Sequence, residues 1–205
     1  CRYWQMVRFF HVIARCCPKL VGAHMEQDTV HILGYHGTLR SVADKIISGD
    51  VFRANRLTKN DWLGEGIYFW DTIEHAVWWN ASQYAKKGAK SPGDLCVIVA
   101  HLRCNEEEYF DLDSPHCMEK LVSFARALNE EMVEKQMPSP DFKKPNEAKH
   151  FYCTFFKREY KIKLMSYTFR YTNEFNLAGF SVGEVKRRQL CATDNSIIHI
   201  DGIAV

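Results

Sequence analysis

Apolar positions along the chain fall into short runs that alternate between extended and helical spacing. Runs with the pattern of strands lie at 30–36, 64–70, 95–102, 109–112, 161–171, 189–192 and 197–200. Runs with the spacing of amphipathic helices lie at 41–47, about 72–86 and 115–135, and polar loops are expected at 52–60 and 136–148. Strands and helices follow one another without a regular strand–helix–strand repeat. The pattern therefore predicts an α+β fold.

The N-terminal residues form a separate unit in this pattern. Apolar side chains of residues 3–17 recur at helical spacing until Pro18, which predicts an amphipathic helix. The tetrapeptide Gly-Ala-His-Met at 22–25 is typical of an expression-vector junction. We therefore divide the chain into an N-terminal segment, residues 1–24, and one domain, residues 25–205. The segment is either fused or vector-derived, or it is a native extension that packs on the domain.

Composition and charge exclude several classes of protein. The 205 residues suffice for one domain with a sizeable core, and 46% hydrophobic with 25% charged residues is a globular profile. A formal net charge of +2 gives no general field that would attract nucleic acid or an anionic membrane. Arg2, Arg8 and Arg15 interrupt the apolar N-terminal stretch, so we expect no membrane-spanning segment and no membrane partner. Any site for a polyanion must be a local patch.

The cysteines and histidines lack the spacing of metal or disulfide sites. Eight cysteines occur without a CxxC pair, and nine histidines without an HExxH motif. We predict reduced cysteines that pack in the core of a cytoplasmic protein, and no bound metal.

Two short motifs suggest chemistry. The first is Gly-Tyr-His-Gly-Thr at 34–38, at the end of a predicted strand, and the second is Gly-Glu-Gly-Ile-Tyr-Phe at 64–69, within another. Alone, each is an ordinary turn or core strand. Together they resemble the His-Gly-Ser/Thr and Gly-x-Gly-Ile-Tyr-Phe strands of the poly(ADP-ribose) polymerase, tankyrase and diphtheria toxin branch of the ADP-ribosyltransferase superfamily. A more diffuse similarity to small bacterial transferase toxin-like domains extends from residue 34 to about residue 200.

The resemblance implies a fold and an NAD⁺ site. The fold would have two small, mostly antiparallel sheets that form an NAD cleft with flanking helices. His36 would hydrogen-bond a ribose hydroxyl, and the bare backbone of Gly37, next to Thr38, would pair with the nicotinamide carboxamide. Tyr68 would be one aromatic face against the cationic nicotinamide ring, and Trp78 or Trp79 the second.

The third position of the triad departs from the family pattern. Relatives usually carry glutamate on a late strand, whereas the matching strand here is Arg-Gln-Leu-Cys-Ala at 188–192, which makes Gln189 the third residue. A glutamine oxygen accepts a hydrogen bond from ribose but carries no charge to stabilise the oxocarbenium ion. Either the glutamine is native or it replaces glutamate in an inactivated protein. Glu174 or Glu184 is an alternative source of a carboxylate for the acceptor.

These residues lead to a functional expectation with alternatives. The resemblance implies an NAD-dependent ADP-ribosyltransferase that modifies RNA or protein, as a bacterial toxin or phage-defence effector with a cognate antitoxin or inhibitor protein. Basic clusters are candidates for tracking a phosphate backbone. They lie at 86–90, 157–163 and 186–188. The alternatives are an NAD glycohydrolase, in which water is the acceptor, and a catalytically weak pseudoenzyme that binds ADP-ribose or a partner.

Overall fold

The computed structural model describes residues 29–54, 61–82, 91–137, 142, 145–172, 176–177, 180–181 and 184–204, with backbone only at 92 and 171–184. Four α-helices lie among them, at Arg40–Ile47 (α2), Ile73–Ser82 (α3), Pro115–Glu134 (α4) and Pro145–Glu159 (α5). The strands are Thr29–Leu39 (β1), Ile67–Trp70 (β2), Leu95–Asn105 (β3), Tyr109–Asp111 (β4), Leu164–Thr172 (β5), Asn176–Leu177 (β6), Phe180–Ser181 (β7), Glu184–Ala192 (β8) and Ile198–Ile203 (β9). The segment 1–24 with its predicted helix, Glu174 and the basic cluster at 86–90 lie outside the described residues.

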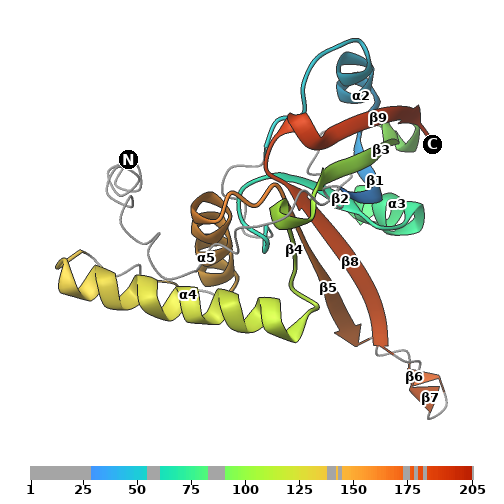
Figure 1. The fold of residues 1–205 in the computed structure, drawn as a ribbon. Helices are drawn as coiled ribbons and strands as arrows, with labels where there is room; N and C mark the ends of the chain where they lie inside the picture. Colours follow the sequence, from blue (N-terminus) through green and yellow to red (C-terminus); the bar gives the residue numbers. More distant parts are fainter. Residues whose placement is uncertain are drawn as a thin grey trace.

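Seven strands form one mixed sheet in the order β4-β5-β8-β2-β1-β3-β9. Neighbours are antiparallel except β4 and β5, which pair in parallel. The α+β class is therefore confirmed, but the sequence-based expectation of two small sheets differs from what is seen. The short strand β2 pairs with β8 along its whole length and with β1 through Tyr35 and Trp70, which joins the two halves into one sheet. A separate two-stranded sheet, β6–β7, lies beyond the far ends of β5 and β8 (Figure 1).

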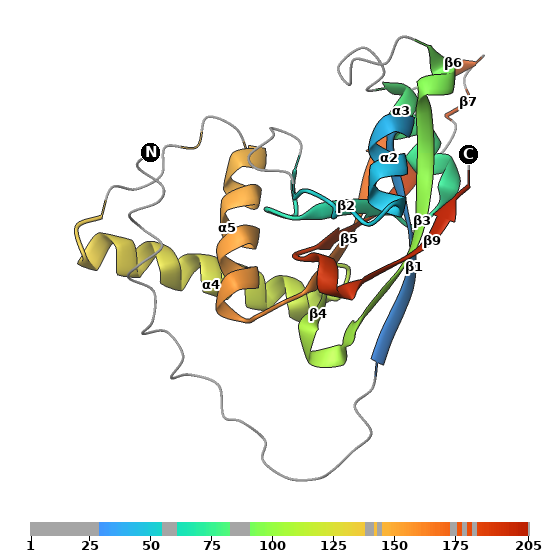
Figure 2. The same ribbon diagram turned by 90° about the horizontal axis from the view of Figure 1, so that it is seen from above.

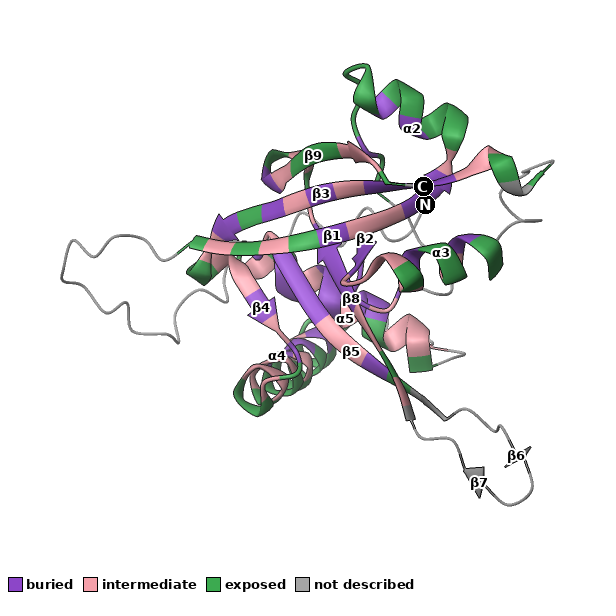
Figure 3. Cartoon of the chain, turned by 90° about the vertical axis from the view of Figure 1, so that its right-hand side faces the viewer, coloured by how far each residue is buried: buried purple, intermediate pink, exposed green. Residues whose placement is uncertain are grey.

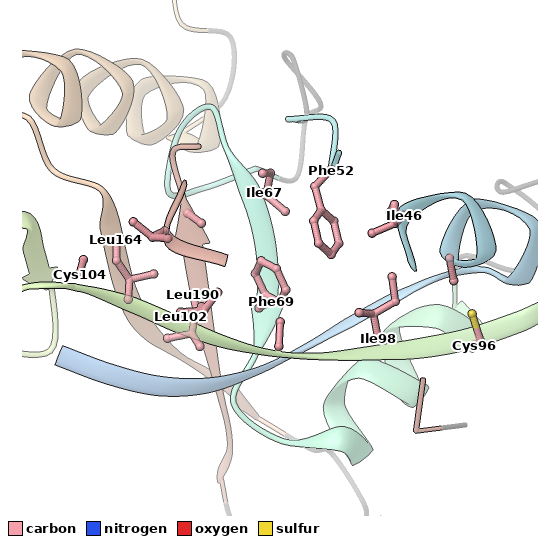
Figure 4. Close-up of a cluster of buried hydrophobic side chains, with 14 residues drawn as sticks. Ile46, Phe52, Ile67, Phe69, Cys96, Ile98, Leu102, Cys104, Leu164 and Leu190 are labelled. Atoms are coloured by element: carbon pink, nitrogen blue, oxygen red, sulfur yellow. The ribbon is translucent and has the colours of Figure 1, made fainter. Parts of the chain in front are cut away.

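One face of the sheet curls around the largest hydrophobic cluster (Figure 4). Alternate residues of a strand point to opposite faces, so β3 contributes every second residue to this cluster, from Cys96 to Cys104. Phe69 of β2 and Leu190 of β8 meet them from the other half of the sheet. Helix α2 covers this face through Ala43 and Ile46, while the rest of the helix is exposed (Figure 3).

The opposite face carries two smaller clusters. Helices α4 and α5 pack at the β4–β5–β8 end, and α3 packs against β1, β2 and β3 (Figures 1 and 2). Tyr68 belongs to the first cluster and Trp70 to the second, two residues further along the same strand. Strand β2 therefore lies where the two clusters meet.

The hydrophobic pattern located most elements but missed α5. Residues 136–148 were expected to form a loop, yet α5 begins at Pro145, which fits the first turn of a helix because its missing N–H would have no helical partner there. The five cysteines that the structure describes are free thiols, and four of them are buried. The expectation that these cysteines pack in the core is confirmed for those four.

Candidate active site

Tyr68 is held by the loop that leads into β2. Its hydroxyl donates to the Gly64 carbonyl at 2.7 Å and accepts from the Leu63 N–H at 3.0 Å. Burial raises the pKa of Tyr68 well above its usual value, and the nearby Cys191 thiol adds to the effect. The hydroxyl therefore stays protonated and fixes the ring in place. This geometry suits an aromatic surface rather than a proton-transfer group.

His36 is joined to Tyr68 through the backbone. Its Nδ1 lies 2.7 Å from the Tyr68 carbonyl oxygen, which can only accept, so Nδ1 carries the proton. In the neutral ring Nε2 is then an acceptor, as a ribose hydroxyl requires. The ring packs on Phe52 and Phe69, in the cluster beneath the first face of the sheet. The His36 and Tyr68 rings thus contact different clusters, although the two residues are hydrogen-bonded neighbours.

Gly37 and Thr38 lie within β1, which runs on to Leu39, and Gly37 is packed directly beneath α3. A Cβ at Gly37 would lie 2.9 Å from the Ala76 carbonyl oxygen and 3.1 Å from Asn80. The buried Asn80 amide donates to the Thr38 and Cys96 carbonyls at 3.2 and 3.0 Å. This glycine is therefore required by helix packing, a role additional to the carboxamide contact that the resemblance implies.

Gln189 lies one step from Tyr68 on the same face of the sheet. It pairs with Trp70 on one side and with Tyr167 on the other, while Tyr68 pairs with Cys191 two residues further along β8. The Gln189 side chain is 9% exposed, and its Oε1 is buried without a hydrogen-bond donor among the described residues. Since an unsatisfied buried acceptor costs about 1–3 kcal/mol, it marks a position where a ligand donor would be stabilising.

The two candidate tryptophans lie in different surroundings. Trp79 packs with Trp70, at 6.0 Å between ring centroids, in the small cluster under α3. Trp78 is 41% exposed, and the Arg187 guanidinium carbon lies 3.5 Å from its ring centroid. Trp78 therefore presents an accessible aromatic surface beside β8, whereas Trp79 is largely a packing residue.

Helix α5 holds the 61–66 loop in place. Thr154 Oγ1 accepts from the Glu65 N–H at 2.9 Å, and the His150 ring donates to the Asp61 carbonyl at 2.8 Å. The Lys157 ammonium, only 3% exposed, donates to the Glu65 carbonyl at 2.6 Å and to Cys191 Sγ at 3.0 Å. Lys157 had been a candidate only as a member of the basic cluster at 157–163, and Thr154 and His150 were not candidates, because α5 carries no recognisable motif around them.

Trp62 is a further residue that the sequence did not single out. Its ring lies against Phe169 of β5, with 4.2 Å between centroids, and its Nε1 is buried without an acceptor in the part of the chain that is described. Lys149 of α5 lies 5.5 Å from the Trp62 ring centroid. The only sequence signal was a tryptophan two residues before the glycine motif.

Most of the basic residues at 157–163 and 186–188 are engaged within the domain. Arg158 pairs with Glu65 at 2.5 Å, and Lys163 pairs with Glu108 at 2.8 Å, which lowers the pKa of that carboxyl. Arg188 pairs with Asp111 at 2.9 Å. Because Lys157 is buried as well, the expectation of a phosphate-binding surface at 157–163 is not supported by these contacts. Arg187 is the cation of the 186–188 cluster that lies beside the candidate site.

Comparisons with known proteins add one relative. No family model and no solved structure matches the chain. A segment of 79 residues, 38% of the chain, is 35% identical to the uncharacterized protein MJ0359 of Methanocaldococcus jannaschii. The matched segment spans 36% of that protein, so the similarity covers about a third of each chain.

Two kinds of feature are absent from the described residues. None of their helices combines the length and apolar character needed to cross a membrane. Within the same ranges, no three histidine, cysteine, aspartate or glutamate side chains are grouped so that they would hold a metal ion.

Proposed function

We propose that the protein is an NAD-dependent ADP-ribosyltransferase that acts on a macromolecular acceptor. The proposal is carried by the buried oxygen of Gln189, which has no donor in the described part of the chain and lies one step from the immobilised Tyr68 ring. These residues fit NAD⁺ because the glutamine oxygen would accept from a ribose hydroxyl and the Tyr68 ring would contact the cationic nicotinamide. The resemblance assigns a second hydroxyl to His36, which the Tyr68 carbonyl fixes, although the His36 ring packs on the opposite face of the sheet from Tyr68 and Gln189.

Bound NAD⁺ would supply an activated ribose whose bond to nicotinamide breaks, with the electron pair leaving on nicotinamide. A nucleophilic nitrogen or oxygen of the acceptor forms the new bond to the same carbon and releases its proton to solvent. Gln189 orients the ribose without adding negative charge, so it stabilises the developing positive charge less than a glutamate would. The resemblance supplies the proposed setting, a toxin or phage-defence effector countered by an antitoxin or inhibitor protein.

The test is nicotinamide release from NAD⁺ in a time course, together with transfer of labelled ADP-ribose to separated protein, RNA and DNA fractions. We expect His36→Ala and Tyr68→Ala to lower release at least about tenfold, the effect of losing roughly 1.4 kcal/mol of transition-state stabilisation. We expect Gln189→Glu to raise it. His116→Ala is the matched control, since this histidine is exposed on α4.

The outcomes separate the competing functions. Labelled macromolecule supports the transferase, and free ADP-ribose without a labelled macromolecule indicates an NAD glycohydrolase instead. A preparation that binds ADP-ribose but releases no nicotinamide, in the wild type and in Gln189→Glu alike, would be a pseudoenzyme. The last result refutes the proposal.

A further inference from the structure

Two tryptophans beside the candidate site are each capped by a cation. Lys149 of α5 lies over the Trp62 ring at 5.5 Å, and Arg187 of β8 lies over the Trp78 ring at 3.5 Å. A cation positioned over an indole face is attracted by the ring quadrupole. The two pairs come from four separate parts of the chain.

These pairs are linked into one continuous strip. Trp62 lies against Phe169, Phe169 pairs with Arg187 across the β5–β8 ladder, and Arg187 covers Trp78. We call these residues the aromatic–cationic strip. Its members are Lys149, Trp62, Phe169, Arg187 and Trp78. Arg187 and Gln189 are two residues apart on β8 and therefore share a face of the sheet. The strip thus runs along that face, next to Gln189.

Unsatisfied polar atoms of opposite character lie at the strip and next to it. The indole Nε1 of Trp62 is a donor with no other hydrogen-bonding role, and it is buried with no acceptor in the described ranges. The neighbouring Gln189 Oε1 is a buried acceptor that is also unsatisfied. Each atom therefore marks a place where a polar ligand group would be stabilising. The edge of a nucleobase carries both donors and acceptors.

We propose that the aromatic–cationic strip binds single-stranded nucleic acid as the acceptor for ADP-ribose. Unpaired bases would stack on Trp62 and Trp78 as Lys149 and Arg187 swing off the indole faces to neutralise the phosphates between the bases. A single strand is required because duplex bases are already stacked and cannot reach the indoles. The inference rests on the proposed function for the transfer step, in which a nitrogen or oxygen of the strand replaces nicotinamide on the ribose carbon. Binding of the strand is independent of that step.

Binding is tested with the full chain and fluorescein-labelled oligonucleotides of RNA and of DNA, single-stranded and duplex, by anisotropy over a series of salt concentrations. We expect single strands to bind and Trp62→Ala or Trp78→Ala to weaken binding about 5- to 150-fold, the range for loss of base–aromatic stacking. Arg187→Gln should lower the slope of log K against log salt by about 0.7, the contribution of one phosphate contact on a single strand. Comparing the RNA with the DNA oligonucleotides shows whether the strip binds strands with ribose or with deoxyribose.

The matched control is Lys120→Ala, because Lys120 of α4 caps the ring of Tyr160, the residue after α5, at 4.7 Å in a cation–π pair outside the strip. It should leave binding and salt slope unchanged. Trp62→Phe keeps an aromatic surface, so its affinity should fall between those of the wild type and Trp62→Ala. Thermal melting of each variant identifies any that fail to fold. If the tryptophan variants fail, the salt slope of Arg187→Gln still tests the proposal, because Arg187 is only partly buried.

The results separate this inference from the proposed function. Single-strand binding without nicotinamide release upholds the strip and refutes the enzyme, whereas release with label only in protein upholds the enzyme and overturns the strip. Equal affinity for duplex and single strands, or a salt slope unchanged by Arg187→Gln, also overturns it.

Discussion

Substituting alanine for Gly37 tests how the candidate site is built. Its φ lies outside the left-handed region, so alanine adds a Cβ without backbone strain, and the whole effect comes from packing. That Cβ would lie 2.9 Å from the Ala76 carbonyl oxygen, an atom of helix backbone that cannot rotate away. It would also lie 3.1 Å from two atoms of Asn80, a side chain tied to two strand carbonyls.

The cost follows from these contacts. Overpacking of this kind typically costs about 1–3 kcal/mol, and displacing Asn80 would weaken two hydrogen bonds worth about 1 kcal/mol each. We expect a loss of about 2–3 kcal/mol, which lowers Tm by roughly 4–12 °C in a chain of this size. Thermal melting and urea unfolding measure the change. Gly93→Ala is the control, because the nearest atom to its Cβ would be Ser91 Oγ at 3.7 Å.

A Gly37→Ala protein as stable as Gly93→Ala would refute the packing argument. If such a protein were stable but released no nicotinamide, the glycine would serve ligand contact alone, as the family resemblance implies. If it were destabilised and its release at low temperature were normal, the glycine would serve packing alone. Loss of both stability and nicotinamide release would show that Gly37 serves helix packing and ligand contact together.

Three further predictions concern the loop and its support. Tyr68→Phe removes the hydroxyl that bonds Gly64 and should destabilise the protein by about 1–3 kcal/mol in urea unfolding, with little change in the aromatic surface. Thr154→Val keeps shape but leaves the Glu65 N–H unsatisfied; a similar loss of stability is expected, and unchanged unfolding would contradict the role given to α5. Burial raises the pKa of Cys153 to about 12, so iodoacetamide should label it negligibly at pH 8 in the native state, as judged by mass spectrometry. Because the folded pKa lies above the unfolded value near 8.5, this thiol's contribution to stability is complete below about pH 8 and declines as pH rises toward 12.

The sequence located most of β1 and β2 but only the last four residues of β8, and it placed Tyr68 and Gln189 on strands that are in fact adjacent. The prediction of two small sheets failed because β2 is only four residues long, and nothing in its composition shows that it pairs on both sides.

The residues that support the site were not predictable in the same way. Trp62 lies in an irregular loop, so its contact with Phe169 depends on a tertiary arrangement with no local signal. Lys157 appeared to be a surface cation, yet the fold buries it against the Glu65 carbonyl. Such contacts join residues about ninety positions apart, and single-sequence patterns do not report pairings of that range.

The position of β2 in the sheet sets the order in which the site can be assembled during synthesis. One of its edges pairs with β1, which precedes it, but the other waits for β8, the strand that brings Gln189. Until residues 184–192 have left the ribosome, Tyr68 has no in-register neighbour on that side, and the 61–66 loop also waits for α5. We expect nascent chains that stop before β8 to be inactive, so that any enzymatic activity appears only when the chain is almost fully translated.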